Sequence, residues 1–263
     1  MKVINANLNE GGSKPDKIKI IPISDVHLGD ELCNLKLFRE TIKQIAEEPN
    51  TYTILNGDLC NMALKNSKSD VYSASLTPME QILQITEFLE PIKDKILVMS
   101  SGNHEDRTAK ETNIDVLRLV ARELGIEDKY ANGWWYLYLS FGENQKSTHK
   151  APVCYTITGC HGSGGGGRKS GGKINRLEEM SNVVLADLYI MGHTHKPIIT
   201  KGVMYSPFYQ SRTLMKHEMY YLMTNSFLEY EGGYAEKMGM MPSNTGITEA
   251  ELSGKIKKIR LSM

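Results

Sequence analysis

Histidine, aspartate and asparagine side chains gather in five short motifs along this 263-residue chain. Five of its seven histidines belong to these motifs. In chain order the motifs are Asp25-Val26-His27, Gly57-Asp58, Gly102-Asn103-His104-Glu105, His161-Gly162 and Gly192-His193-Thr194-His195. Carboxylate oxygen, imidazole nitrogen and amide oxygen suit Mn²⁺, Fe or Zn²⁺ better than they suit metals that seek thiolates. The residue types therefore predict a divalent-metal site, provided that the fold brings the motifs together.

Each motif follows a segment with the pattern of a β-strand. The expected strands before the motifs cover residues 17–24, 51–55, 96–99, 153–158 and 188–191. Helix-like segments follow the first two strands, at 35–48 and from Thr77-Pro78 to Leu89, and this alternation predicts a mostly parallel sheet. Pro22 lies inside the first strand and argues against pairing on both of its sides. Ligands of open α/β sheets bind beyond the carboxyl ends of the strands, where all five motifs are expected to lie.

The remaining pattern predicts a third helix, a later helix and more strands. These are helices at 112–124 and 174–182, strands at 136–141, 219–223 and 255–261, and an irregular Gly/Met/Pro-rich stretch at 235–248. No internal repeat or linker-like composition divides the chain. We therefore expect a single domain over residues 1–263, with the metal-site core at about 18–205 and a β-rich, irregular C-terminal segment at about 206–263.

Composition narrows the class of protein. The chain carries 31 basic and 31 acidic side chains, and this balance removes the simplest electrostatic case for a dedicated DNA or membrane-surface binder. No long apolar stretch predicts a membrane span, and the first residues are too polar for a signal peptide. The four cysteines form no C-x-x-C pair. We expect a soluble, cytoplasmic protein with reduced thiols and no membrane partner; its oligomeric state cannot be read from the sequence.

The ordered motifs resemble those of the calcineurin-like metallophosphoesterases. Any one of them is common, but all five in this order, over about two thirds of the chain, are specific. The resemblance implies an α/β fold, a four-layer α/β/β/α sandwich with a two-metal site on one edge. It also implies two divalent ions, with Mn favoured and Fe, Zn or Ni as alternatives.

Ligand roles follow from the resemblance, block by block. It implies that Asp25, His27 and His195 hold one ion. It implies that Asn103, His161 and His193 hold the second ion. Asp58 would bridge the two, and His104 would be a catalytic residue over the reacting phosphoryl group.

The expected reaction is hydrolysis of a phosphate ester by in-line attack of a metal-bound hydroxide. Two ions can clamp the attacking and leaving oxygens, and metal binding lowers the pKa of water from about 15.7 towards about 7. His104 would offset charge on the phosphoryl oxygens and protonate the leaving alkoxide. The expected partner is a phosphate-ester substrate, with nucleic acid or a nucleotide as candidates.

A departure from the protein Ser/Thr phosphatases of the superfamily bears on the substrate. Asn61 and Met62 stand where those enzymes have an aspartate–arginine pair that supports the histidine and grips phosphate. Asn61 could still orient an imidazole, and Arg107 or Arg168 could replace the missing arginine. We therefore expect a phosphodiesterase or nuclease. The alternatives are a phosphomonoesterase acting on phosphoprotein or a small metabolite, and a metal-binding module without catalysis.

Several features of the sequence have two interpretations. The Gly-rich loop at 162–172, flanked by cations, is either a lid that contacts substrate or a surface loop. Glu105 and Asp106 either support the site or are simply solvated. His149 and His217 match no motif and are expected to be surface or hydrogen-bonded histidines.

Overall fold

Two six-stranded β-sheets form the centre of the computed structural model, which describes residues 1–9, 12–65, 71–164, 169–233, 236, 239 and 241–263. The first sheet has the order β1-β6-β7-β8-β10-β9 and the second the order β12-β11-β2-β3-β4-β5. The strands of the first are β1 (Lys2–Asn7), β6 (Trp135–Phe141), β7 (Val153–Cys160), β8 (Leu188–Met191), β10 (Thr213–Met223) and β9 (Ile198–Phe208). The strands of the second are β12 (Ile259–Ser262), β11 (Glu249–Ser253), β2 (Lys17–Ile23), β3 (Thr51–Asn56), β4 (Ile96–Ser100) and β5 (Tyr130–Ala131).

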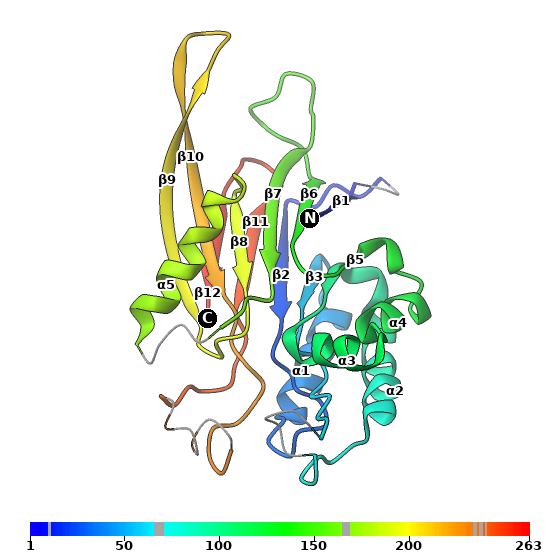
Figure 1. Cartoon of the computed structure of the whole chain (residues 1–263). Helices are drawn as coiled ribbons and strands as arrows, with labels where there is room; N and C mark the ends of the chain where they lie inside the picture. The colour runs from blue at the N-terminus through cyan, green and yellow to red at the C-terminus, as the bar shows by residue number, and fades with distance from the viewer. Residues whose placement is uncertain (10–11, 66–70, 165–168, 234–235, 237–238, 240) are drawn as a thin grey trace.

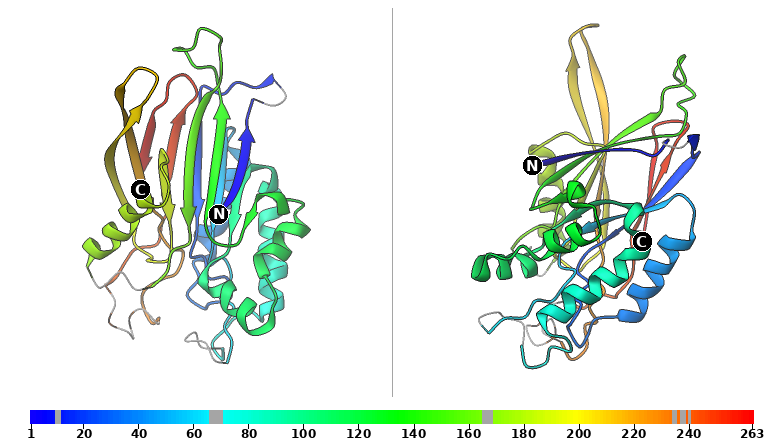
Figure 2. Two further views of the ribbon diagram at one scale, coloured as in Figure 1. Left: turned by 45° about the horizontal axis from the view of Figure 1, so that its top comes forward. Right: turned by 90° about the vertical axis from the view of Figure 1, so that its right-hand side faces the viewer.

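Helices cover the outer face of each sheet. The second sheet is covered by α1 (Leu35–Glu47), α2 (Pro78–Leu89) and α4 (Val116–Glu123), and α3 (Asn103–Thr112) follows β4. The first sheet is covered by α5 (Ser170–Glu179). Short 3₁₀ segments lie at Glu90–Lys95, Glu127–Lys129 and Met180–Asn182. Figures 1 and 2 show the resulting α/β/β/α arrangement, which is the fold class that the resemblance implied.

Three apolar clusters hold the layers together. The middle one lies between the two sheets and contains Trp135, Leu137 and Ile190 from the first sheet and Ile20 and Ile54 from the second. The other two fill the space between each sheet and its own helices. Burying one side chain of this size stabilises the fold by about 1.5–3 kcal/mol, and each cluster contains many of them. The strand ends are therefore held in place by the packing of the whole sandwich and not by any single element.

Most predicted elements are present, with corrections. The helix expected at 112–124 is α4 alone, because Asn113 takes a left-handed conformation (φ 59°) and ends α3. The strand expected at 255–261 begins only at Ile259, and the strands β1, β5, β9 and β11 and the helix α3 were not predicted. Pro22 is paired on one side only, as predicted. β3 pairs with it, whereas β11 pairs only with residues 17–20 of β2.

Two further expectations meet the described structure only in part. Part of the irregular stretch at 235–248 lies outside the described residues, and residues 241–248 have no regular secondary structure. None of the helices in the described ranges is long and apolar enough to cross a bilayer.

Candidate metal centre

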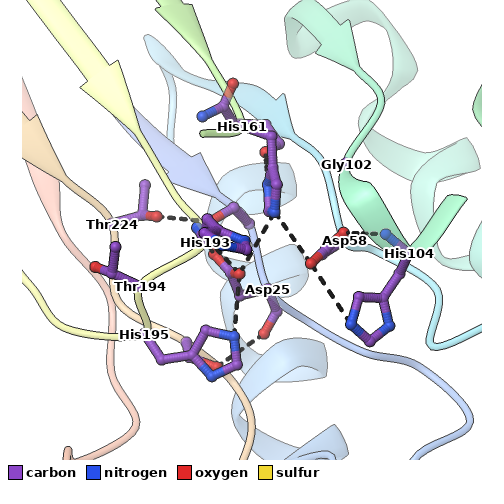
Figure 3. A network of polar contacts seen from close by, with 12 residues as sticks. Asp25, Asp58, Gly102, His104, His161, His193, Thr194, His195 and Thr224 are labelled. Carbon is purple, nitrogen blue, oxygen red and sulfur yellow. Dashed lines mark hydrogen bonds and ion pairs between the residues drawn. The ribbon is translucent and has the colours of Figure 1, made fainter. Parts of the chain in front are cut away.

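All five motifs lie at the carboxyl ends of strands, as predicted. Asp25, Asp58 and the segment beginning at Ser101 follow the parallel strands β2, β3 and β4, while His161 and the Gly192–His195 turn follow β7 and β8. The two sheets thus present their polar ends at one edge of the sandwich. Figure 3 shows the side chains meeting there.

The backbone at this edge is strained. Five of the candidate ligands, although none is glycine, have φ between 51° and 69°, a region that L-residues rarely adopt. They are Asp25, His27, Asp58, His193 and His195. Each such residue costs on the order of 1–3 kcal/mol and persists only where the surrounding structure enforces it, most often at functional sites.

The glycines of the motifs permit close packing at the same edge. Gly57 and Gly162 have positive φ, whereas Gly102 does not. A Cβ on Gly102 would lie 2.3 Å from both the backbone nitrogen and Oδ1 of Asp58. A Cβ on Gly192 would lie 2.5 Å from Ser24 Oγ. A larger residue at either position would displace a candidate ligand.

Three ligand atoms form a first group. Asp25 is fully buried, and its Oδ1 lies 3.2 Å from His195 Nε2 and 4.0 Å from His27 Nε2. The two imidazole nitrogens are themselves 3.1 Å apart. One ligand atom from each of Asp25, His27 and His195 can therefore reach a common point. This is the set that the resemblance assigned to one ion.

A second group lies beside the first. His161 Nε2 is 3.0 Å from Asp58 Oδ2 and 3.9 Å from Asp25 Oδ1, and His193 completes the group. Asp58 also belongs to a third group, with His27 and His104. Asp58 therefore shares one group with His27, a member of the first set, and another with His161 and His193, as a bridging carboxylate must; Figure 3 shows it beside His161 and His104.

His104 faces this cluster from the first turn of α3. Its Nδ1 lies 2.8 Å from the main-chain oxygen of Asn61, and its Nε2 is 3.9 Å from Asp58 Oδ2. Its backbone N–H donates to Asp58 Oδ1 at 2.8 Å, and its ring meets the His27 ring edge-on at 4.4 Å. Because Nδ1 contacts a carbonyl, it must carry the proton as the donor, which directs Nε2 towards the cluster.

Burial and mutual charge set the protonation of the cluster. Burial opposes ionisation of Asp25 and Asp58, but the neighbouring imidazoles outweigh it and lower the pKa of both carboxyls. Burial opposes protonation of His161, but Asp58 and Asp25 outweigh it and raise the pKa of His161 to about 10. Burial and neighbouring imidazoles lower the pKa of His27 and of His193. Two anionic carboxylates and neutral imidazoles are the forms in which these groups bind cations.

Comparison with protein families gives the class of this site. The family model of the calcineurin-like phosphoesterases matches residues 18–197, well over half of the chain. The chain belongs to this family. No curated protein matches the chain.

Several solved structures are similar to this chain at low identity. One is an uncharacterized protein, titled a predicted phosphoesterase, from Streptococcus pneumoniae, with 14% identity over 94% of this chain and 98% of that chain and a TM-score of 0.35. A metallophosphoesterase from Sphaerobacter thermophilus has 13% identity over 90% and 84%, with a TM-score of 0.37. GAP50, titled the anchor in the inner membrane complex of Plasmodium, has 13% identity over 94% and 84%, with a TM-score of 0.46.

The clustered residues of this chain fit a pair of divalent cations. His161 Nε2 is buried and lies 3.0 Å from Asp58 Oδ2, but it has no partner in hydrogen-bonding geometry among the described residues. Buried polar atoms of this kind are rare unless a missing ligand satisfies them. The Nδ1 atom of His161 lies 2.8 Å from the main-chain oxygen of Asn56 and holds the ring so that Nε2 faces Asp58. A carbonyl behind a ligating imidazole is the usual support of a metal-binding histidine.

The other predicted residues are placed as follows. Asn103 is the first residue of α3 and is exposed, and no described contact joins its side chain to the cluster. Arg107 is partly buried one turn further along α3, close enough to His104 to contribute to lowering that residue's pKa. Asn61 acts on His104 through its main-chain oxygen, while its side chain donates to Asp30 Oδ2 at 3.3 Å. Arg168 lies outside the described residues.

The position of the missing arginine is filled by a core residue. Met62 is 1% exposed and belongs to the cluster under α1, α2 and α4. Its backbone N–H donates to Gln81 Oε1 at 2.9 Å. The side chain at this position therefore packs away from solvent, and it offers no charge to a phosphate.

Several buried residues that hold the candidate ligands in place were not predicted from the sequence. Ser24 Oγ contacts Asp25 Oδ2 and lies 2.6 Å from Thr224 Oγ1, so the segment after β10 supports the first carboxylate. The Asn56 side chain, at the end of β3, donates to the Cys160 oxygen and accepts from the Trp135 indole, joining the two sheets behind His161. Only polarity at strand ends pointed to Ser24 and Asn56; their partners Thr224, Cys160 and Trp135 are distant in sequence.

Proposed function

We propose that this protein is a dinuclear-metal phosphoesterase that hydrolyses phosphodiesters, such as nucleic acid ends or nucleotides, in preference to monoesters. The carrying observation is that Asp58 belongs to one ligand group with His161 and His193 and to another with His27 and His104, whose backbone N–H it accepts from. Asp25, His27 and His195 would hold one cation. His161 and His193 would hold the other, with Asn103 as a further ligand.

The chain's own residues would orient the reaction. When bound, two Mn²⁺ ions would supply an ionised water at neutral pH and offset the charge of an in-line displacement. Asp25 and Asp58 are held ionised by their surroundings and would keep both ions at fixed positions. The strained strand ends would prevent the ligands from relaxing away between turnovers.

His104 would act on the phosphoryl group as a general acid. Its Nδ1–H is committed to the Asn61 carbonyl, so the proton that it gives to the leaving oxygen must come from Nε2. Burial, aided by Arg107, lowers the pKa of His104, so a bound anionic substrate would have to favour the imidazolium before His104 could donate its proton.

The surroundings favour a diester over a monoester. Binding a dianionic monoester requires strong positive charge around the phosphate, and Met62 supplies no charge at the position where the phosphatases have an arginine. Two cations lie beside the Gly192–His195 turn: Lys173 Nζ donates to the Thr194 oxygen at 3.1 Å, and Lys196 follows His195. Such an arrangement suits a substrate that continues beyond the reacting phosphorus.

The test is turnover of bis-p-nitrophenyl phosphate against p-nitrophenyl phosphate, with single-stranded DNA as a third substrate. The chelated protein would be assayed before and after Mn²⁺ addition. We expect Mn²⁺-dependent hydrolysis with the diester preferred, abolished by Asp58→Asn and unchanged by His149→Asn, which alters an exposed histidine. A preference for the monoester would favour the phosphomonoesterase alternative. Uptake of two metal ions without turnover would favour the metal-binding module.

A further inference from the structure

A buried carboxylate stands directly behind the candidate bridging ligand. Glu105, in the first turn of α3, is 1% exposed. Its Oε2 accepts from the backbone N–H groups of Asp58 and Gly102, both at 3.0 Å, and its Oε1 accepts from the N–H of Cys60 at 2.9 Å. Both oxygens are therefore occupied by the backbone, and neither is directed to the metal groups.

These hydrogen bonds are reciprocal with those of Asp58. While Glu105 accepts from the backbone of Asp58, the Asp58 carboxylate accepts from the backbone N–H of His104 at 2.8 Å. The loop after β3 and the start of α3 are thus tied together by two carboxylates that point in opposite directions. Gly102 lets the two segments approach, because any Cβ there would overlap Asp58.

The burial of the Glu105 carboxylate behind Asp58 requires a physical explanation. Burying an ionisable group is unfavourable: burial and the charge of Asp58 raise the pKa of Glu105 to about 7, and the backbone donors only partly offset this effect. An ordinary helix start needs only one such acceptor, which Glu105 provides by accepting from the Gly102 N–H. The other two donors belong to the loop that carries Asp58, so the carboxylate acts across elements.

We propose that Glu105 is a positioning residue that holds the Asp58 carboxylate between the two cations and fixes its separation from His104. The inference rests on the proposed dinuclear site. Glu105 would act through the backbone of Asp58 and would touch neither substrate nor metal.

Glu105→Gln tests the proposal at nearly constant volume. An amide has one acceptor oxygen, so its NH₂ group must face either the Cys60 N–H or the N–H groups of Asp58 and Gly102. We expect affinity for the second Mn²⁺ to fall about 10- to 100-fold, the range found when a support behind a ligand is removed. The exchange-coupled signal of the Mn²⁺ pair in electron paramagnetic resonance should weaken, and kcat on the diester should fall while KM stays within about twofold.

Asp106→Asn is the matched control. Asp106 is the neighbouring acid on the same helix, but it accepts from Ser101 Oγ at 2.7 Å and not from the loop of Asp58. We expect its Mn²⁺ affinity, coupled signal and kcat to match those of the unaltered protein. Glu105→Asp keeps the charge with a shorter reach, and we expect a loss between those of Gln and wild type. This milder variant serves as the test if Glu105→Gln does not fold.

The outcomes separate the two proposals. If the unaltered protein shows no coupled Mn²⁺ pair, the dinuclear function fails. If the unaltered protein shows the pair and turnover, but Glu105→Gln and Glu105→Asp retain both in full, the positioning role of Glu105 is overturned.

Discussion

At the scale of single residues, the site combines strain with charge. Asp25 and His27 both hold left-handed backbone conformations within one D-x-H motif, and this turn allows both side chains to reach one point. A straight strand would send residues i and i+2 along one face but several ångströms apart. The motif therefore works only because the sandwich enforces the turn.

Replacement of His104 separates metal binding from catalysis. His104→Ala removes the general acid but none of the ligands of the two principal groups, so we expect Mn²⁺ stoichiometry to remain and kcat to fall about 10²- to 10⁴-fold. Steady-state kinetics on the diester and metal analysis of the same sample provide the measurement. An unchanged kcat would remove His104 from the mechanism.

Metal binding should compete with a proton at His161. The pKa of His161 is raised to about 10, so in the metal-free protein this residue is protonated at neutral pH. A cation requires the neutral imidazole, so affinity should rise about tenfold per pH unit between pH 6 and 8 if one proton is released. Calorimetric titration with Mn²⁺ in buffers of different ionisation enthalpy would count that proton. A Kd independent of pH would contradict the assignment.

At the scale of elements, the site depends on how closely the loop after β3 approaches α3. Gly102→Ala would place a methyl group 2.3 Å from Asp58, so we expect weakened Mn²⁺ binding and loss of most turnover. Gly171→Ala in α5 is the control, because nothing lies within 4 Å of its Cβ and alanine favours a helix by up to about 1 kcal/mol. Thermal unfolding and metal titration of both variants provide the comparison. Equal Mn²⁺ affinities would show that the approach at Gly102 is not critical.

Elements with an apolar period could be predicted, and those without one could not. The strands β2, β3 and β4 are buried along most of their length, and each is recognisable in the sequence as an apolar, β-branched run. β1 buries only Ile4. β9 fully buries only Ile198, and its exposed positions include the apolar Val203 and Tyr205, so neither strand shows an apolar period in the sequence. α3 is almost wholly polar, and its role depends on Glu105 reaching Asp58 across 47 positions of sequence, which no local pattern reveals.

The whole molecule has the candidate site at one end and an extended β-hairpin at the other. β9 and β10 pair over their full length, from Phe208 with Thr213 at the turn to Ile198 with Met223. Only residues Tyr220–Met223 of β10 also pair with β8, whose carboxyl end leads into the His193 turn. At about 3.3 Å per residue, Thr213 lies roughly 30 Å from Met223. In Figures 1 and 2 the hairpin extends beyond the layers of the sandwich.

Shortening this hairpin should therefore leave the site intact. Replacing residues 205–216 with Asn-Gly keeps Met204, which packs against the α5 cluster, and removes exposed side chains such as Tyr205 and Leu214. We expect Mn²⁺ affinity and diester turnover to stay within about twofold, since no group that supports a ligand is lost. Tyr221→Ala is the contrast, because Tyr221 is buried and stacks on Tyr189, and its loss should cost about 3 kcal/mol or more of unfolding free energy. A shortened protein that folds but loses turnover on the small diester would show that the hairpin acts on the site from a distance.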